Sequence, residues 1–396
     1  MALAQLGVMD WIVAAAALGA WLVWLQRSRR PPRKAARALA SPLAADPHAP
    51  PFTGPPTYPN RPQMELVDNG QVRVTKILVH PIKSCRGTSV PEVRYTPQGL
   101  ENDRKWAVYD PAENKILTAR EVPKLVLVEP SLKYDTSSPT RGKLVVTAGS
   151  ESFSVPIEPT QDILTQWEVV QDPYLFGRST SDAYIIKPLS PADPAPSAVL
   201  SSFLGRAVHL VVKGPTPRYC KPTQAFPTLE ATAVFQDGYP VLIASEESLE
   251  AVAAAVNNAA RPDAPEKVGG IDQARWQREK VPIERFRPNI VVRGAGVPFA
   301  EDVWQKIYIN SPGSTTKDES KSFTLVSQCP RCLLPNVDPK TGVRDAAVPF
   351  KVISKFRTGV NPEAVKTPCF GSNSVPGGNG VVRVGDRISV EEWLQL

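Results

Sequence analysis

The chain has 396 residues, 42% of them hydrophobic, so it is long enough to bury a large core and to form more than one domain. Its 42 prolines argue against a mainly helical protein, and its five cysteines, an odd number, do not indicate a secreted disulfide framework. The formal net charge is +7, but a basic cluster between residues 27 and 37 supplies most of it. The remaining body is nearly neutral, which argues against a nucleic-acid-binding surface.

The N-terminal segment is predicted to be a membrane anchor followed by a tether. Residues 11–25 carry no charge and residues 2–9 are almost as apolar, which approaches the roughly 20 residues that a membrane-spanning helix needs. The basic cluster follows this stretch, whereas in a cleaved signal peptide it would precede it. We therefore predict a single transmembrane helix at residues 1–26, with the body in the cytosol, and a basic, then Pro- and Ala-rich disordered tether at residues 27–70. A cleaved targeting sequence is the alternative.

The body is predicted to be mainly β with some α. A short amphipathic helix is expected at residues 197–204, stopped by Gly205, and a second helix at residues 246–256 with Ser245 as its N-cap. Runs rich in β-branched and aromatic residues predict strands at 72–79, 106–110, 124–129, 143–146, 208–212, 240–245, 290–292, 323–328 and, with a turn, 381–390.

Two short stretches have the composition of an anion-binding site. Lys83 and Ser84 lie close to Gly87 in sequence, where small residues would let backbone and a cation approach an anion. On composition alone, we favour an ordinary turn with solvated charges. Arg287 precedes Pro288, which restricts the backbone before it, so we expect an extended Arg287 with a directed side chain. The alternative for Arg287 is a surface ion pair.

The segment Cys329-Pro330-Arg331-Cys332 follows a predicted strand. A thioredoxin-like redox pair needs its first thiol at a helix N-terminus, and the prolines at 335 and 339 disfavour such a helix. A structural zinc site needs further paired ligands, which the other cysteines and the three histidines do not provide. A single thiolate ligand to a soft metal or metal cofactor, and two buried structural thiols, both remain open. Asp338 is a candidate proton donor, although we favour a role in starting a turn.

Residues 327–342 resemble the cofactor-binding segment of MOSC-domain proteins, and especially of the mitochondrial amidoxime reducing components, which are molybdenum enzymes. The chain also resembles further motifs of this family, in the family's order, at Lys83-Ser84, Asp103-Arg104 and Arg287-Pro288-Asn289. The resemblance implies a MOSC-type β-barrel domain at residues 191–396, packed with a MOSC N-terminal β-barrel-like domain at residues 71–190.

The resemblance also implies which residues form the site. Cys332 corresponds to the protein ligand of molybdenum and is the expected catalytic residue. Residues expected to bind the pterin cofactor are Lys83, Ser84, Arg104, Ser245, Arg287, Asn289 and Cys332. An arginine fork suits a phosphate group, whereas helix capping explains Ser245 equally well.

The activity implied by the resemblance is reduction of N-hydroxylated, amidoxime-type compounds at a mononuclear molybdenum held by one pterin dithiolene and one protein thiolate. Electrons would come from cytochrome b5 and its NADH-dependent reductase. The implied location is the mitochondrial outer membrane with the body facing the cytosol, and another intracellular membrane is the alternative.

Two other functions keep the same phosphate contacts. One is sulfur transfer, as in the C-terminal domain of molybdenum cofactor sulfurases; the other is a membrane-tethered carrier of the molybdenum cofactor. Pyridoxal phosphate binding is associated with the wider family, but the chain is too short to add a pyridoxal-phosphate domain to the body and anchor. Only a reductase needs an electron donor and turnover.

Overall fold

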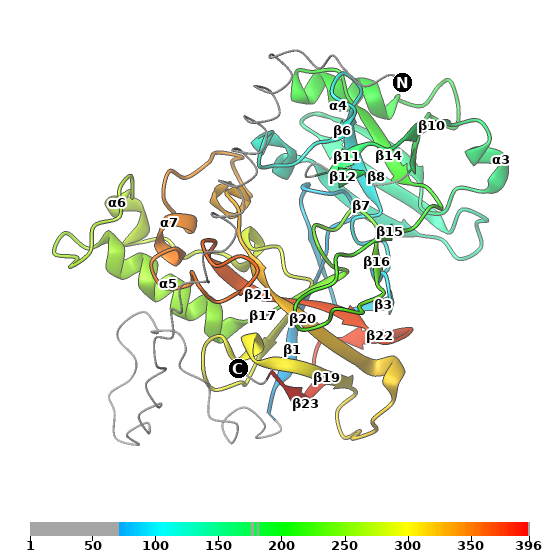
Figure 1. The fold of residues 1–396 in the computed structure, drawn as a ribbon. Helices are drawn as coiled ribbons and strands as arrows, with labels where there is room; N and C mark the ends of the chain where they lie inside the picture. The colour runs from blue at the N-terminus through cyan, green and yellow to red at the C-terminus, as the bar shows by residue number, and fades with distance from the viewer. Residues whose placement is uncertain (1–70, 176–177, 180–181, 395–396) are drawn as a thin grey trace, which may run out of the picture. The chain divides into compact units, whose positions relative to one another are not determined.

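The computed structural model describes residues 71–175, 178–179 and 182–394. The predicted anchor at residues 1–26 and the predicted tether at residues 27–70 lie outside the described residues. Within the described ranges, no helix combines the length and the apolar character that crossing a membrane requires. These ranges fold mainly as β-structure with a few helices, as predicted (Figure 1).

A closed barrel organises the C-terminal part of the chain. Its strands are β18 (Ile290–Arg293), β17 (Val241–Ser245), β21 (Cys369–Pro376), β20 (Ser322–Pro330), β19 (Trp304–Asn310), β23 (Arg387–Trp393) and β1 (Arg73–Val79), in spatial order. Pairing of β1 with β18 closes the ring, and β2 (Thr88–Val90) adds to the other edge of β1. Ile77, Ile243 and Ile290 lie in register on three neighbouring strands and are fully buried, because alternate residues of a barrel strand point inward.

Helices lie beside this barrel. The longest, α5 (Glu246–Ala260), begins at Ser245, whose side chain accepts a hydrogen bond from the Ser248 N–H as predicted for an N-cap. Its buried residues recur at helical spacing and pack with the short helices α6 (Gln273–Trp276) and α7 (Phe350–Ile353) (Figure 1). The single-turn 3₁₀ helices of this part are η2 (Ile283–Arg285), η3 (Ala300–Asp302), η4 (Glu319–Lys321) and η5 (Leu334–Asn336).

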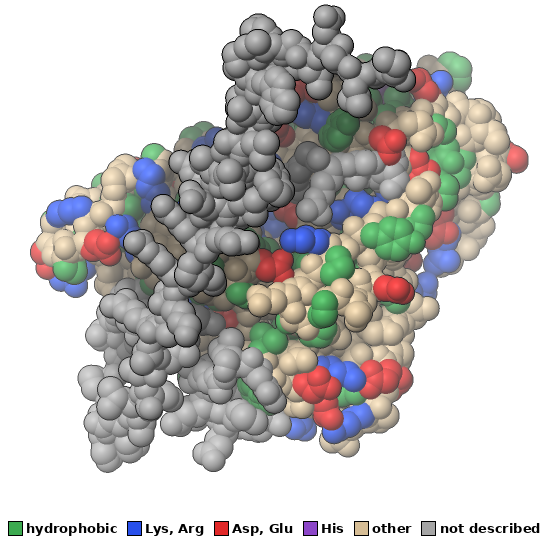
Figure 2. Space-filling view, viewed as in Figure 1, with side chains coloured by type: hydrophobic (Ala, Val, Ile, Leu, Met, Phe, Trp, Pro, Cys, Tyr) green, Lys and Arg blue, Asp and Glu red, His purple; other side chains and the backbone are tan. Residues whose placement is uncertain are grey.

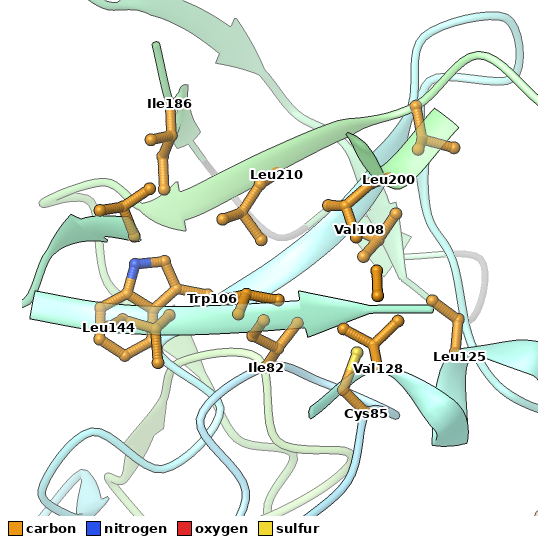
Figure 3. Packing of buried hydrophobic residues seen from close by; sticks show 14 of the residues in the cluster. Ile82, Cys85, Trp106, Val108, Leu125, Val128, Leu144, Ile186, Leu200 and Leu210 are labelled. Atoms are coloured by element: carbon orange, nitrogen blue, oxygen red, sulfur yellow. The ribbon is translucent and has the colours of Figure 1, made fainter. Parts of the chain in front are cut away.

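A second β-structure follows β1 in the chain. One sheet has the order β10 (Glu168–Gln171), β13 (Asp182–Ile185), β14 (His209–Lys213), β5 (Trp106–Asp110), β6 (Lys115–Ile116), β11 (Tyr174–Leu175) and β12 (Arg178–Ser179). Another contains β7 (Glu129–Tyr134), β8 (Gly142–Ala148) and β9 (Glu151–Pro156), with η1 (Pro123–Leu127), α3 (Gln161–Leu164) and α4 (Pro196–Leu204) nearby in sequence. Trp106, fully buried, lies among aliphatic side chains of this region, and Ile82 and Cys85 reach the same core (Figure 3).

Each of the two β-structures contains a strand from the other side of the predicted division at residue 190. The N-terminal strand β1 closes the barrel of C-terminal strands, and β14 pairs with β5. Small sheets formed by β3 (Glu92–Thr96), β4 (Gly99–Leu100) and β22 (Gly380–Arg383), and by β15 (Arg218–Tyr219) and β16 (Thr232–Ala233), complete the described structure. The predicted division at residue 190 stays a prediction.

Most predicted elements are confirmed, but two differ. Residues 124–129 do not form a strand: Pro123 starts the 3₁₀ helix η1, because its fixed φ suits the first turn of a helix, and β7 begins only at Glu129. Residues 381–390 contain the expected turn, but β22 and β23 on its two sides join different sheets. Hydrophobic alternation finds strands but cannot tell which partner each strand will meet.

On the face shown in Figure 2, basic and acidic side chains are interspersed among the described residues. Surface ion pairs occur in the described structure, such as that of Arg293 with Glu246 and Glu250. This mixed surface agrees with a nearly neutral body.

Candidate functional site

A pocket of about 310 Å³ brings together segments that are far apart in sequence. Six predicted site residues line it: Lys83, Ser84, Arg104, Arg287, Asn289 and Cys332. Its other lining residues include Thr223, Gln236, Asp237, Gly238, Tyr239, Leu242, Phe286, Ser327, Cys329, Pro330, Arg331, Leu334, Asn361, Glu363, Ala364 and Asn373. We call Lys83, Ser84, Arg104 and Arg287 the cation wall, and residues 329–338 the thiol turn.

Lys83 is held by a backbone hydrogen bond and by two acceptors of its ammonium group. Its N–H donates to the carbonyl of Trp106 at 2.8 Å, where the chain leaves β1 and meets β5. Its ammonium donates to the Phe235 carbonyl at 2.8 Å and pairs with the carboxylate of Asp237. Burial lowers the pKa of Lys83 to about 8, and Asp237 only partly opposes this. Lys83 is therefore still mainly a cation at neutral pH.

Three residues of the cation wall have left-handed backbones. The φ angles are 66° at Ser84, 50° at Arg104 and 56° at Arg287. Non-glycine residues adopt this region at an energetic cost. Residues with such strained backbones cluster at functional sites, where the surrounding structure holds them in place. The expectation of an extended Arg287 is therefore wrong: Pro288 disfavours the right-handed helical region for Arg287, but the local turn selects the left-handed region.

The Arg287 turn is held from both ends. Its backbone N–H donates to the Glu284 carbonyl at 3.2 Å, and its carbonyl accepts from Arg104 Nη2 at 3.0 Å. The side chain donates from Nη1 to the Cys85 carbonyl at 2.7 Å. Burial, assisted by the nearby charge of Arg104, lowers the pKa of Arg287 to about 10, so its guanidinium still carries a charge at neutral pH.

One donor of Arg287 is left over. Among the described residues, its buried Nη2 has no hydrogen-bond partner. Because an unsatisfied buried donor costs free energy, a native site that keeps one is suited to an acceptor supplied by a ligand. Arg104 adds a second guanidinium beside it, with Asp103 as an ion-pair partner at 2.6 Å.

Asn289 uses both ends of its amide within the protein. Its Nδ2 donates to the Leu78 carbonyl at 3.3 Å, and its Oδ1 accepts from the Leu242 N–H at 3.1 Å. The residue thereby ties β1 to the start of β17 at the pocket floor. This geometry supports a structural contribution, and direct contact with a cofactor stays a prediction.

The thiol turn follows the end of β20. Arg331 donates from Nη1 to the sulfur of Cys329 at 3.1 Å and from Nη2 to the Phe286 carbonyl at 2.8 Å. Burial raises the pKa of the Cys329 thiol, and Arg331 only partly opposes this, so Cys329 stays protonated at neutral pH. The sulfur of Cys332 instead accepts a hydrogen bond from the Leu334 N–H at 3.5 Å.

Arg331 also lines the pocket, although no sequence motif indicated a role for it. Its Nε is buried and, within the described part of the chain, lacks a hydrogen-bond partner. The available signal was its position between two thiols, since a residue flanked by two pocket residues is forced into the same neighbourhood.

The structure narrows the alternatives for the two thiols. The short helix near them is the 3₁₀ helix η5, which begins after Cys332 and so offers Cys329 no helix N-terminus. The described residues contain no group of three or more His, Cys, Asp or Glu side chains placed to hold a metal ion. A metal bound by Cys332 would thus need ligands that a cofactor provides.

Ser245, the remaining predicted cofactor residue, does not line this pocket. Its hydroxyl is fully buried and lies 2.9 Å from the Glu301 carboxyl, which Ser248 also contacts. Burial, with the neighbouring Asp302 charge, raises the pKa of Glu301 to about 7. Helix capping and this buried cluster account for Ser245, and its cofactor role stays a prediction.

Comparison with known proteins gives two matching family models. A MOSC N-terminal beta barrel domain matches residues 71–205, and a MOSC domain matches residues 230–389. Neither description names pyridoxal phosphate, so that expectation has no support.

Three curated relatives illustrate the similarity. Mitochondrial amidoxime-reducing component 1 of Mus musculus is 30% identical over 326 residues, covering 80% of this chain and 81% of the relative. Mitochondrial amidoxime reducing component 2 of Rattus norvegicus is 29% identical over 327 residues, covering 80% and 82%. The molybdenum cofactor sulfurase of Danio rerio is 28% identical over 304 residues, which are 74% of this chain but only 31% of that protein.

Proposed function

Since the chain belongs to the MOSC-domain family and resembles the mitochondrial amidoxime reducing components over most of its length, we propose that it is a molybdenum-cofactor reductase of N-hydroxylated, amidoxime-type compounds. The observation that carries this proposal is the pocket itself. It places four buried or half-buried cations and the Cys332 thiol around one space, although they come from segments far apart in the chain.

The residues present fit such a cofactor. A pterin phosphate would offer acceptors to the unpartnered Nη2 of Arg287 and to the unpartnered Nε of Arg331, both buried among the described residues. Lys83 and Arg104 would add positive charge, and Asp237 and Asp103 would balance part of it. The molybdenum would take Cys332, a soft thiolate, as its protein ligand and its other ligands from the cofactor, since the part of the chain that the structure describes holds no group of three or more metal-binding side chains.

The bound cofactor would supply a molybdenum centre able to pass two electrons to a substrate. The chain's own residues then have separate tasks. The cation wall would hold the anionic end of the cofactor, Cys332 would fix its metal end, and the space beside the thiol turn would admit a small substrate. Cys329 is a neutral thiol that accepts a hydrogen bond from Arg331. We therefore take Cys332 as the thiol that binds the metal.

Partners and location belong to the same proposal. We take the electron donors to be cytochrome b5 and its NADH-dependent reductase, by resemblance to the family. Mitochondrial location is supported by the names of the relatives. The outer membrane is proposed from the family resemblance alone, and the cytosolic side for the body from the order of apolar and basic residues at residues 1–37.

A second candidate is sulfur transfer or cofactor storage without reductase turnover. The similarity to a molybdenum cofactor sulfurase favours it, since that similarity covers 74% of this chain. Both candidates predict cofactor binding, and only the reductase predicts turnover with an electron donor.

The test uses protein produced in a host that makes the molybdenum cofactor, with cytochrome b5, its reductase and benzamidoxime. We expect Cys332→Ser to lower turnover by at least about a thousandfold while pterin remains bound by the cation wall. Cys329→Ser is the matched control and should keep activity within about threefold. Molybdenum bound without turnover in the unchanged protein would favour the second candidate, and zinc or no metal in every variant would refute both.

A further inference from the structure

Arg285 is a buried guanidinium that does not line the pocket. It ends the turn η2, two residues before Arg287, and its side chain is only 1% exposed. Its Nη1 donates to the carbonyls of Pro335 at 3.1 Å and Asn336 at 3.0 Å, and its Nη2 donates to Asp338 at 2.9 Å. All these acceptors belong to the thiol turn.

The carbonyls that Arg285 holds belong to the same helical turn that contacts the pocket sulfur. Pro335 and Asn336 are part of η5, and Leu334, the first residue of η5, donates its N–H to Cys332 at 3.5 Å. The Val337 N–H returns to the Leu334 carbonyl at 2.9 Å and closes the turn. A three-residue 3₁₀ helix has little stability of its own, so its geometry depends on the groups that bind it from outside.

Asp338, the carboxylate that Arg285 contacts, belongs to a larger cluster of ion pairs. Arg275 also donates to Asp338, at 2.6 Å, and its guanidinium lies 4.8 Å from the Trp276 ring centroid. The Trp276 Nε1 donates to Asp345 at 2.8 Å, and Asn336 donates to the Asp345 carbonyl at 2.9 Å. Glu279 also pairs with Arg275, at 2.8 Å, so two arginines meet three carboxylates and the cluster leaves no excess positive charge beneath the turn.

Asp338 has no proton to give in this arrangement. Burial alone would raise the pKa of Asp338, but the Lys340 N–H and the two arginines outweigh burial and lower the pKa. Its Oδ1 accepts from the N–H groups of Lys340 and Thr341, as the expected turn requires. The carboxylate thus starts one turn and binds the arginine that supports another.

We propose that Arg285 is a positioning residue for Cys332: with Asp338, it fixes the η5 turn whose Leu334 N–H contacts the Cys332 sulfur. Arg285 and Arg287 belong to the same short segment at the end of η2. The Arg287 guanidinium lines the pocket, whereas the Arg285 guanidinium contacts the thiol turn. The positions of the cation wall and of the thiol are thereby coupled. The catalytic consequence rests on the proposed reductase function, whereas the fixing of the turn does not.

The test compares Arg285→Met with Lys213→Met in the full chain, isolated with its cofactor. Lys213 is a matched control, since its ammonium also contacts one carboxylate, Asp182, and two backbone carbonyls, but it lies at the end of β14 and does not line the pocket. We expect amide hydrogen exchange of a peptide covering residues 331–338 to become about tenfold faster in Arg285→Met and to stay unchanged in Lys213→Met. Equal acceleration in both variants, or in neither, would overturn the inference.

Two further variants keep the question answerable if Arg285→Met does not fold. Arg285→Lys keeps the charge without the fork and should give an intermediate exchange rate. Asp338→Asn, alone and with Arg285→Lys, should affect the same peptide non-additively, because the two side chains act as one unit; additive effects would refute that coupling.

The kinetic arm separates positioning from general stability. If the reductase function holds, Arg285→Lys should lower kcat for benzamidoxime about tenfold with KM unchanged, since the thiol rather than the substrate space is displaced. An unchanged kcat despite faster exchange would refute the catalytic consequence. Absence of turnover in the unchanged protein would count against the proposed function alone, and the exchange result would still decide the role of Arg285.

Discussion

The cation wall and the thiol turn face the same pocket but handle charge differently. In the cation wall, the charge of Arg104 contributes to the lowered pKa values of Lys83 and Arg287, and Arg287 keeps an unpartnered donor among the described residues. Beneath the thiol turn, the charges of Arg275 and Arg285 are fully compensated by Asp338, Asp345 and Glu279. An excess of buried charge is costly unless a ligand compensates it, whereas a balanced cluster can stabilise structure without one.

The backbones differ in the same sense. Three residues of the cation wall have positive φ angles, while none of the described residues 329–338 does. Strain in the wall implies a fixed arrangement prepared for a ligand. The thiol turn instead obtains its geometry from hydrogen bonds to Arg285, so it should be easier to loosen by mutation.

Breaking the cation wall should have the largest effect on cofactor retention. Arg287→Met removes a buried charged donor, so we expect cofactor affinity to fall about a hundredfold. The free energy of unfolding should change by less than about 1 kcal/mol, since an uncompensated buried charge is lost together with its one bond to Cys85. Pterin content after gel filtration and urea unfolding measure the two quantities. Arg293→Met, at an exposed arginine nearby in sequence, is the control, and equal pterin loss in both variants would contradict the comparison.

A smaller effect should come from the proton of Lys83. Its pKa of about 8 means that the side chain is charged below pH 8 and loses its charge above it. A bound phosphate favours the charged form, so cofactor affinity should be constant below pH 8 and fall about tenfold per pH unit above it. Pterin retained on dialysis at pH 7 and pH 9.5 measures this. Lys83→Arg should remove the dependence, and a flat profile in the unchanged protein would argue against Lys83 as a phosphate contact.

The smallest effect on the pocket is expected from a change at Ser245, which belongs to neither the cation wall nor the thiol turn. Ser245→Ala should lower the free energy of unfolding by about 1–3 kcal/mol, because α5 loses its N-cap and Glu301 loses a buried hydrogen-bond partner. Pterin content should not change. Measured pterin loss in this variant, beyond that of an equally destabilised Lys213→Met, would restore Ser245 as a cofactor residue and extend the cation wall.

Short-range patterns predicted much of what the structure contains. Alternating hydrophobic residues located β1, β5, β14, β17 and β20, and Ser245 and Gly205 marked helix ends as expected. The prediction of a strand at residues 124–129 failed because an apolar run of that length fits a 3₁₀ turn as well as a strand. Pro123 favoured the 3₁₀ turn. The prediction of an extended backbone at Arg287 failed for a related reason. Pro288 disfavours the right-handed helical region for Arg287 but does not choose between the extended and left-handed regions.

The sequence by itself determined a mainly β body, the order of its strands along the chain, and the identity of the residues with chemical potential, because these follow from local periodicity, turn chemistry and recognisable motifs. Only the tertiary structure decided that Lys83, Arg287 and Cys332 share a pocket while Ser245 does not. It alone revealed the support given by Arg285 to the thiol turn. Such contacts join segments distant in sequence, and they form only when closure of the barrel by β1 brings both ends of the body together.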